Sequence, residues 1–429
     1  MAEKPATEAP PHPTPEVRKK APRSFWHHLR DALPVIVVVS LVTLGVEHAG
    51  GLRSFETAAL DTWLHLTTSL EAQHVVIVGI TDDDYRNTKL FNNTSPLKRS
   101  ALQQVLKNIV LGNPRVIGVD LDTADGDPRE GEPRESRDNS PPIVWAREAE
   151  ISHDSIVEKL LPVLGQENPH NGETGLALLP LDWDGVVRRY RRVFRLNEHD
   201  RVASFPWAVA TRYAVVSGLC EVGTPAGNTK RGDRSFCKTF GDMPTPEGDA
   251  LEEPIVLNFS GERYRFPRLT AGQVLQAADG DAWAQHGPLT GKIVLLGGMY
   301  RAARDEHVTP VGVRTGVELM AQAIETELQG GGIRFANHLW ILVLEILVGM
   351  VLVVLHYSFS LGWAVILSIV AIPVLTCLGS WLAFNTFALW ASFIPIVVSV
   401  LIHQLYDHAK EYRRMHRELQ ARVVNQGKA

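Results

Sequence analysis

Four long apolar runs stand out in the hydropathy pattern, one near the start of the chain and three near its end. The first covers 32–50 and is short for a transmembrane helix, which needs roughly 20 apolar residues. The other three match that length, and tryptophans lie near their ends, as is typical of membrane interfaces; they cover 339–357, 361–381 and 387–405. The pattern predicts one N-terminal and three C-terminal transmembrane helices.

The first run has two explanations. A cleaved signal peptide has an apolar segment of roughly 7–15 residues and a small-x-small site after it. Here the preceding region is long, and no such site stands ahead of Gly50. These features favour an uncleaved anchor over a cleaved signal.

Basic residues gather before the first run and after the last one. They are Arg18, Lys19, Lys20, Arg23 and Arg30 at one end, and Lys410, Arg413, Arg414, Arg417 and Arg422 at the other. The positive-inside rule then places both termini in the cytoplasm and the long segment 51–337 outside, in the periplasm or the extracellular space. The terminal segments 1–31 and 406–429 are expected to be a disordered, Pro-rich basic tail and a short basic helix.

Between the membrane runs, strands and helices alternate as in an α/β domain. The predicted strand 74–80 is apolar on both faces, as in the centre of a parallel sheet. A helix is expected to begin at Ser95 and Pro96, as N-cap and first helical residue. A second strand at 115–121 then completes a right-handed crossover with a parallel pairing.

The rest of this segment continues the pattern. Further strands are predicted at 142–146, 254–261 and 292–298, and helices at 153–164 (capped by Asp154 or Ser155), 204–219 and 315–329. The stretch 174–196 is expected to form two strands joined by a tight turn at Asp182–Gly185, with an exposed arginine-rich edge at 188–192. A helix over 51–73 is expected to continue the first membrane helix outward as a stalk.

Charge and cysteine content narrow the classes of function. The net charge is −5, so there is no global basic field that would favour nucleic acid. Cys220 and Cys237 both lie in the segment expected outside the cell, where an oxidising environment favours a disulfide between them. The alternative is two unrelated thiols; Cys377 lies inside a predicted span.

Seven segments of the chain, in their order, resemble the type-2 CHASE domain, a sensory extracellular module found beside bacterial cyclases and histidine kinases. They are "VVIVGITDDD", "PRVIGVDLD", "DWDGVVRRYR", "PIVLNFSG", "GKIVLLGG", "DEHVTPVG" and "TGVELMAQAIETEL". The resemblance covers about 55–337 together with the flanking spans. It implies an α/β sensor domain inserted between membrane helices.

Three features depart from that family. "LFNNTSPLKRS" stands where an aromatic-Pro-Arg segment is usual, and Leu319 and Met320 replace a small or His residue near the last helix of the domain. The family normally continues into a cytoplasmic enzyme or kinase, whereas only about 24 residues follow the last predicted span, too few for a folded domain. A separate signalling partner is therefore expected.

Carboxylates follow the carboxyl ends of several predicted strands. Asp82 and Asp83 follow the first strand, Asp120 and Asp122 the second, and Asp305, Glu306 and His307 come shortly after the strand 292–298. In α/β folds ligands bind at these strand ends. If the strands are neighbours, the side chains form one ligand-binding rim, suited to calcium, magnesium or a small polar ligand. The alternative is that each acid is a solvated cap of a turn or helix.

Catalytic motifs give little support to an enzyme. The chain has no G-x-S-x-G elbow, no phosphate-binding Gly-rich loop and no zinc-ligand spacing. A metal-dependent envelope hydrolase would need the rim acids to activate water.

Two features near the membrane have two explanations each. Glu345, the ionisable residue well inside a predicted span, either contacts another span or reaches the outer interface by its own length. Leu405, His408, Tyr412, Met415 and Leu419 recur with heptad spacing, which suits a homodimer or a docked partner helix. A basic tail lying on anionic lipid is the alternative.

The sequence as a whole favours a membrane receptor subunit that binds an unknown periplasmic signal and relays it to a separate partner. A structural scaffold that binds another envelope protein is the alternative, and the hydrolase is a second one.

Overall fold

The computed structural model divides into two compact units, each described here by itself. The helical unit comprises Met1–Arg53, Asn337–Leu378 and Ser392–Ala429, and the α/β unit comprises Ser54–Ala336 and Gly379–Ala391. The structure describes residues 25–66, 72–95, 97–121, 140–152, 155–160, 173–195, 201–219, 253–259, 266–277, 283 and 287–426.

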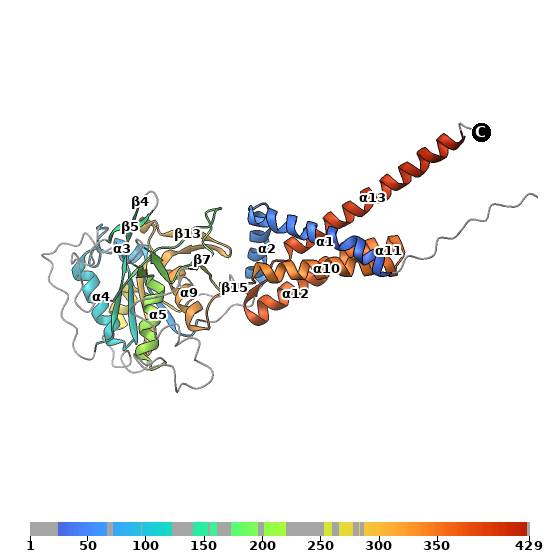
Figure 1. Ribbon diagram of the computed structural model, residues 1–429. Helices are drawn as coiled ribbons and strands as arrows, with labels where there is room; N and C mark the ends of the chain where they lie inside the picture. The colour runs from blue at the N-terminus through green and yellow to red at the C-terminus, as the bar shows by residue number, and fades with distance from the viewer. Residues whose placement is uncertain are drawn as a thin grey trace, which may run out of the picture. The chain divides into compact units, whose positions relative to one another are not determined.

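A six-stranded parallel sheet forms the centre of the α/β unit (Figure 1). Its order is β11 (Arg268–Thr270), β1 (Val75–Ile80), β12 (Ile293–Gly298), β2 (Val116–Asp120), β3 (Ile143–Arg147) and β6 (Glu173–Leu176). Every residue of β1 and β12 is buried, as their unbroken apolar sequences predict for strands covered on both faces.

The two faces of the sheet carry separate cores, because alternate residues of a strand point to opposite sides. Val76, Val78 and Ile80 face the helices α4 (Arg99–Leu111) and α7 (Ala271–Ala277). Val75 and Ile77 face α5 (Phe205–Val216) and α9 (Gly316–Leu328). The result is a three-layer α/β fold.

The predicted parallel pairing of the first two strands is wrong. Although β1 and β2 run in the same direction, β12 lies between them and pairs with both. A strand that comes about 170 residues later in the chain is thus inserted at the centre of the sheet, which nearness in sequence could not indicate. The strands predicted at 74–80, 115–121, 142–146 and 292–298 and the helices at 204–219 and 315–329 are confirmed.

Other expectations need correction. In the segment predicted as a helix at 153–164, Ser155–Leu160 forms β5, which pairs antiparallel with β4 (Ala149–Ser152). The β-branched Ile156 and Val157 favour this strand. Helix α4 begins at Arg99 rather than Pro96, and Leu97 already packs against the core before the helix starts.

The stretch 174–196 does not fold as a simple hairpin. The turn at Asp182–Gly185 is present, with Gly185 at φ 77°, but β6 joins the central sheet. Its expected partner is replaced by two short strands that pair elsewhere: β7 (Arg189–Tyr190) with β10 (Ile255–Val256), and β8 (Val193–Arg195) with β9 (Arg201–Ala203). The expected exposed edge is also wrong, because Arg188 is buried.

The stalk predicted over 51–73 is interrupted. Helix α1 (Phe25–His48) ends before Gly50, which has φ 79°, and α2 (Arg53–Leu66) is a separate helix. The left-handed conformation at Gly50 ends the helical ladder at little steric cost. In α2, Leu60 and Leu64 are buried, whereas Phe55 is exposed.

Among the residues that the structure describes, three helices are long and apolar enough to cross a membrane: Leu29–His48, His338–Ser358 and Gly362–Phe387. They correspond to α1, α10 (His338–Ser358) and the continuous stretch of α11 (Leu361–Ile366), a π-helical turn (Leu367–Ala371) and α12 (Ile372–Phe387). The π turn ends two residues before Pro373, whose missing N–H disturbs regular α-helical bonding.

The fourth predicted span does not form one helix over 387–405. Helix α12 ends at Phe387. Ala388 follows with φ 49°, and the chain then forms the short strand β16 (Leu389–Trp390). Helix α13 (Ile394–Gln426) then begins, with Pro395 in its first turn, where proline is tolerated. Its apolar part is therefore shorter than the run in the sequence suggested.

Candidate functional site

Two strand ends of the predicted rim converge. Asp120 ends β2, and Asp305 and His307 lie at the start of the hairpin formed by β13 (Glu306–Thr309) and β14 (Gly312–Thr315). The Asp305 Oδ1 lies 2.9 Å from His307 Nε2. The Asp305 carbonyl also accepts a hydrogen bond of 2.9 Å from the N–H of Gly316, the first residue of α9. The rim therefore meets the start of α9.

The electrostatic environment of Asp120 is unusual. Burial raises its pKa to about 7, and repulsion by Asp305 and Glu148 adds to that shift, while His307 opposes it. The side chain is therefore close to half-protonated at neutral pH. Such perturbed acids gather at functional sites, although structural networks produce them too.

The other predicted rim acids have local structural roles. Asp82 accepts a hydrogen bond of 3.1 Å from the backbone N–H of Arg301. Asp83 is exposed, and its carbonyl accepts from the N–H of Asn87. Their neighbour Asp84 completes a capping box with Thr81 at the start of α3 (Asp82–Arg86). These contacts match the alternative in which acids cap turns and helices.

A metal at the rim has no support from the geometry so far. Within the described parts of the chain, no group of three or more His, Cys, Asp and Glu side chains is arranged to hold a metal ion. Asp122 and the cysteine pair Cys220 and Cys237 lie outside the described residues. Calcium or magnesium binding and the disulfide thus stay predictions; Cys377 is a free thiol.

We expect Asp120→Asn to change how stability depends on pH. Because the folded state holds the Asp120 proton more tightly than the unfolded chain, the free energy of unfolding falls as pH rises from about 4 to about 7. Asparagine cannot ionise, so the variant should lose this dependence and be more stable at pH 8, by at most about 4 kcal/mol. Thermal unfolding of the full chain in detergent between pH 4 and 8 measures this.

Asp83→Asn is the matched control, because the same chemical change is made on an exposed side chain. Its pH profile should follow that of the wild type. Parallel profiles for Asp120→Asn and the wild type would contradict the assignment of a raised pKa to Asp120.

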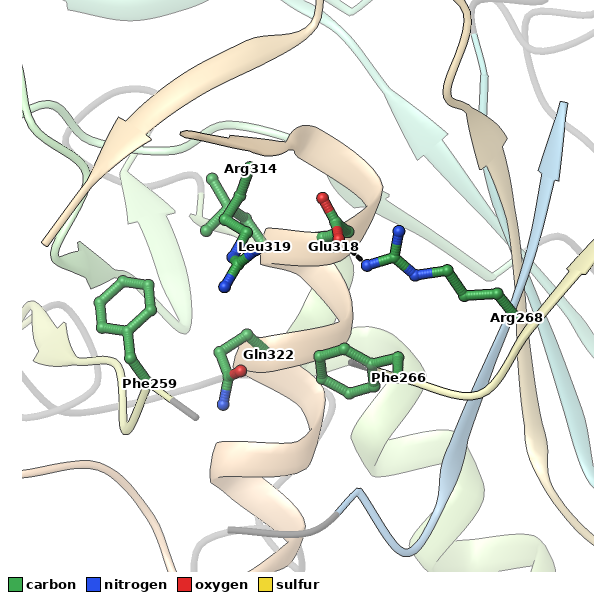
Figure 2. A pocket seen from close by; sticks show the side chains of 7 residues that line it. All are labelled: Phe259, Phe266, Arg268, Arg314, Glu318, Leu319 and Gln322. Carbon is green, nitrogen blue, oxygen red and sulfur yellow. Dashed lines mark hydrogen bonds and ion pairs between the residues drawn. The ribbon is translucent and has the colours of Figure 1, made fainter. Parts of the chain in front are cut away.

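A small pocket lies beside the first half of α9 (Figure 2). It is lined by Phe259, Phe266, Arg268, Arg314, Glu318, Leu319 and Gln322, which come from the segments around β10, β11, β14 and α9. Sequence reasoning missed this site, because its residues come from four separate segments. One local signal was available: "TGVE" at 315–318 has the S/T-x-x-E spacing of a capping box.

Glu318 organises one side of this pocket. Its Oε2 accepts from Thr315 N at 2.9 Å and from Thr315 Oγ1 at 3.1 Å, which caps α9. Its Oε1 accepts from Arg268 Nη2, an ion pair seen as a dashed line in Figure 2. Edge strand β11 is thereby tied to the start of α9.

The remaining polar side chains of α9 bind other parts of the unit. Gln322 Nε2 donates to Asn258 O at 2.5 Å. Further along, Glu325 accepts from Gln73 N at 2.6 Å and lies 3.0 Å from His74 Nδ1. At the end of the helix, Glu327 makes a bidentate pair with Arg192 at 2.7 and 2.9 Å. Because α9 is buried, these bonds fix its position relative to each segment.

A buried arginine binds α2 to the rest of the unit. Arg188 is 2 % exposed and is surrounded by three carboxylates. It makes a bidentate contact with Asp61 of α2 at 2.7 and 2.8 Å. It also donates to Asp184 at 2.8 Å and to Asp182 at 3.1 Å, in the turn that the sequence predicted.

The segments that connect to the membrane helices are also bonded to each other within the α/β unit. Strand β15 (Arg334–Phe335), which precedes α10, pairs in parallel with β16, which precedes α13. Trp63 of α2 donates to Ser380 Oγ at 3.3 Å, and that hydroxyl donates to Ala391 O at 2.6 Å. Two connections therefore join these segments: the β15–β16 strand pair and the hydrogen bonds of Trp63, Ser380 and Ala391.

In the helical unit, Glu345 is buried at 3 % exposure. This position contradicts the explanation in which its side chain reaches the outer interface, and it agrees with a contact inside the helix bundle. The heptad positions of α13 named above are exposed where the structure describes them, with Leu405 at 71 % and Leu419 at 61 %. Their partner, protein or lipid, stays open.

The geometry and the comparisons with known proteins agree. The chain matches the family model of the CHASE2 domain over residues 35–356, from within α1 to the end of α10. Neither the curated proteins nor the solved structures compared with it gave a match. An α/β unit between apolar helices is the arrangement that the seven segments implied. The chain belongs to the CHASE2 family, whose domain is an extracellular sensor in signalling.

Proposed function

We propose that this protein is an inner-membrane receptor subunit that binds a ligand in the periplasm and relays the change to a separate partner. Both termini would lie in the cytoplasm, with α13 crossing as a fourth span. The observation that carries the proposal is the placement of α9. Its first half lines the pocket, and its last turn is bonded to Arg192 through Glu327, 11 positions before α10 begins at His338.

The path from pocket to membrane is short along the chain. Helix α9 ends at Leu328, and Gly330 and Gly331 follow with φ of 105° and 91°. Such angles strain any other residue, so the turn is set by the glycines. Strand β15 and α10 come next. A displacement of α9 would therefore reach α10 and, through the β15–β16 pair, the segment before α13.

The two conformations of such a receptor must differ in their affinity for the ligand, since the ligand shifts the equilibrium between them only by that difference in affinity. Typical coupling free energies are about 1–3 kcal/mol, or roughly 5–150-fold. The bonds at the end of α9 are strong enough to carry coupling of this size.

The test is a fusion of the full chain, through α13, to a catalytic cyclase domain as a reporter. We compare the wild type with the double variant Arg192→Met/Glu327→Leu, which replaces the bidentate pair with apolar side chains of similar size. A receptor predicts at least a fivefold change in basal cyclase rate, because the end of α9 is released from its partner.

Arg301→Met serves as the matched control, since Arg301 has an 88 % exposed side chain and its contact with Asp82 is long, at 3.9 Å. Its fusion should keep the wild-type rate. Equal rates in all three fusions would favour the alternative of a structural scaffold.

A further inference from the structure

We propose that the pocket beside α9 binds a small organic carboxylate, with the carboxylate on Arg314 and the apolar part between Phe259 and Phe266. This inference rests on the proposed function and deepens it, because it names the chemical class of the signal. In Figure 2, Arg314 extends along the start of α9, and Gln322 lies between the two phenylalanines in this view.

The first argument is charge. Of the three charged side chains that line the pocket, Arg268 and Glu318 form an ion pair with each other. Arg314 is partly buried, and its guanidinium has no hydrogen bond or ion pair with any residue that the structure describes. The pocket therefore holds one uncompensated positive charge. An anion would supply the partner that a partly buried guanidinium normally has.

The second argument is the shape of the donor group. A guanidinium presents parallel N–H donors that match the two oxygens of a carboxylate. Phe259, Phe266 and Leu319 supply the apolar part of the lining, whereas Arg268, Glu318 and Gln322 are already bonded to other groups of the chain. An inorganic phosphate would place oxygens against the apolar part without donors. A ligand made of one carboxylate and a short apolar group leaves no oxygen without a hydrogen-bond donor.

The third argument is position. Arg314 lies directly before Thr315, the N-cap of α9, and pairs in the β13–β14 hairpin with His307 of the rim. Leu319 and Gln322 are on α9 itself. A ligand held by Arg314 would thus contact the hairpin and the first turns of the helix together. The rim hairpin and the pocket become parts of one site.

The experiment uses the full chain in lipid nanodiscs and follows its melting temperature. Propionate and benzoate are the probes, propionamide is the neutral isostere, and inorganic phosphate tests for a simple anion site. Short ligands of about five heavy atoms bind at best in the millimolar to micromolar range. A saturable rise in melting temperature with a carboxylate, absent with propionamide, is expected.

Three variants locate the binding. Arg314→Gln should weaken binding of the carboxylate at least tenfold. Arg314→Lys keeps the charge but loses the paired N–H donors of the guanidinium, so its loss of affinity should be intermediate. Arg301→Gln is the charge-matched control, because Arg301 is 88 % exposed and outside the pocket. It should bind as the wild type does.

Several results would overturn the proposal. These are no shift with either carboxylate, an equal shift with propionamide, a larger shift with phosphate, or an equal loss in Arg301→Gln. If Arg314→Gln does not fold, the Arg314→Lys variant and the propionamide comparison still decide. The reporter fusion with Arg192→Met/Glu327→Leu tests the relay without any ligand, so failure of the carboxylate alone leaves the receptor function standing.

Discussion

Replacing Arg188 with methionine is expected to lower the free energy of unfolding of the α/β unit by about 3–5 kcal/mol. The substitution leaves Asp61, Asp182 and Asp184 close together without their shared cation. Removing one partner of a buried ion pair costs more than the pair contributes, because the remaining charges stay desolvated and repel each other. Thermal unfolding followed by tryptophan fluorescence should show a melting temperature lower by roughly 6–12 °C.

The same variant should change the response to acid. The hydrogen bond that Arg188 donates to the Asp184 carboxylate is the main reason why the pKa of Asp184 lies below its usual value. A lowered pKa contributes stability that is present above about pH 4 and is lost as pH falls through the folded-state value. The wild type should therefore lose stability below about pH 4, and Arg188→Met should lose less over that window.

Arg301→Met is the control for both readouts. This side chain is 88 % exposed and contacts Asp82 only at 3.9 Å, so the change should cost less than about 1 kcal/mol. If both variants melted at the same temperature, the buried network would have no special part in stability.

The second large effect concerns Arg192 and Glu327. Glu327→Leu alone is expected to cost about 3–5 kcal/mol, since it leaves Arg192 without its carboxylate beside Arg334. Arg192→Met alone should cost less, because burial raises the pKa of Glu327 and the carboxyl can take up a proton. The double variant should be within about 1–2 kcal/mol of the wild type.

These four proteins form a double-mutant cycle, and unfolding in detergent gives the coupling energy between the two residues. We expect a coupling of at least about 2 kcal/mol, at or above the upper end for residues in direct contact. Additive losses would mean that the pair does not act as a unit. Near-wild-type stability of the double variant also makes its reporter fusion a test of relay rather than of folding.

Much of the fold followed from local pattern. The strands "VVIVGI" and "IVLLGG" are apolar on both faces, and only a central position in a parallel sheet buries both. Their order could not be predicted in the same way, because β12 enters between β1 and β2 from a distant part of the chain. The apolar run at 387–405 likewise gave no sign of the break at Ala388.

The candidate site was predictable only where it depends on strand ends. Asp120 and Asp305 converge, as the topology of α/β sheets indicates. The burial of Arg188 was not predictable, because "RRYRR" is typical of an exposed edge and the deciding partner, Asp61, is 127 residues away. The pocket was missed for a similar reason, since Arg314 is significant only because no residue that the structure describes forms an ion pair or hydrogen bond with its guanidinium.

Because helix α13 is unbroken, the number of residues in it determines the orientation of any domain joined to its C-terminal end. Its 33 residues rise about 1.5 Å and turn about 100° each. A rotation of the helix near Ile394 is therefore delivered, at the same angle, some 50 Å away. Inserting one residue at the junction with a reporter would turn the reporter by about 100°, whereas seven residues would nearly restore its orientation. Output from such fusions should rise and fall with a period of about 3.6 residues of helical linker and return close to its starting value at seven residues.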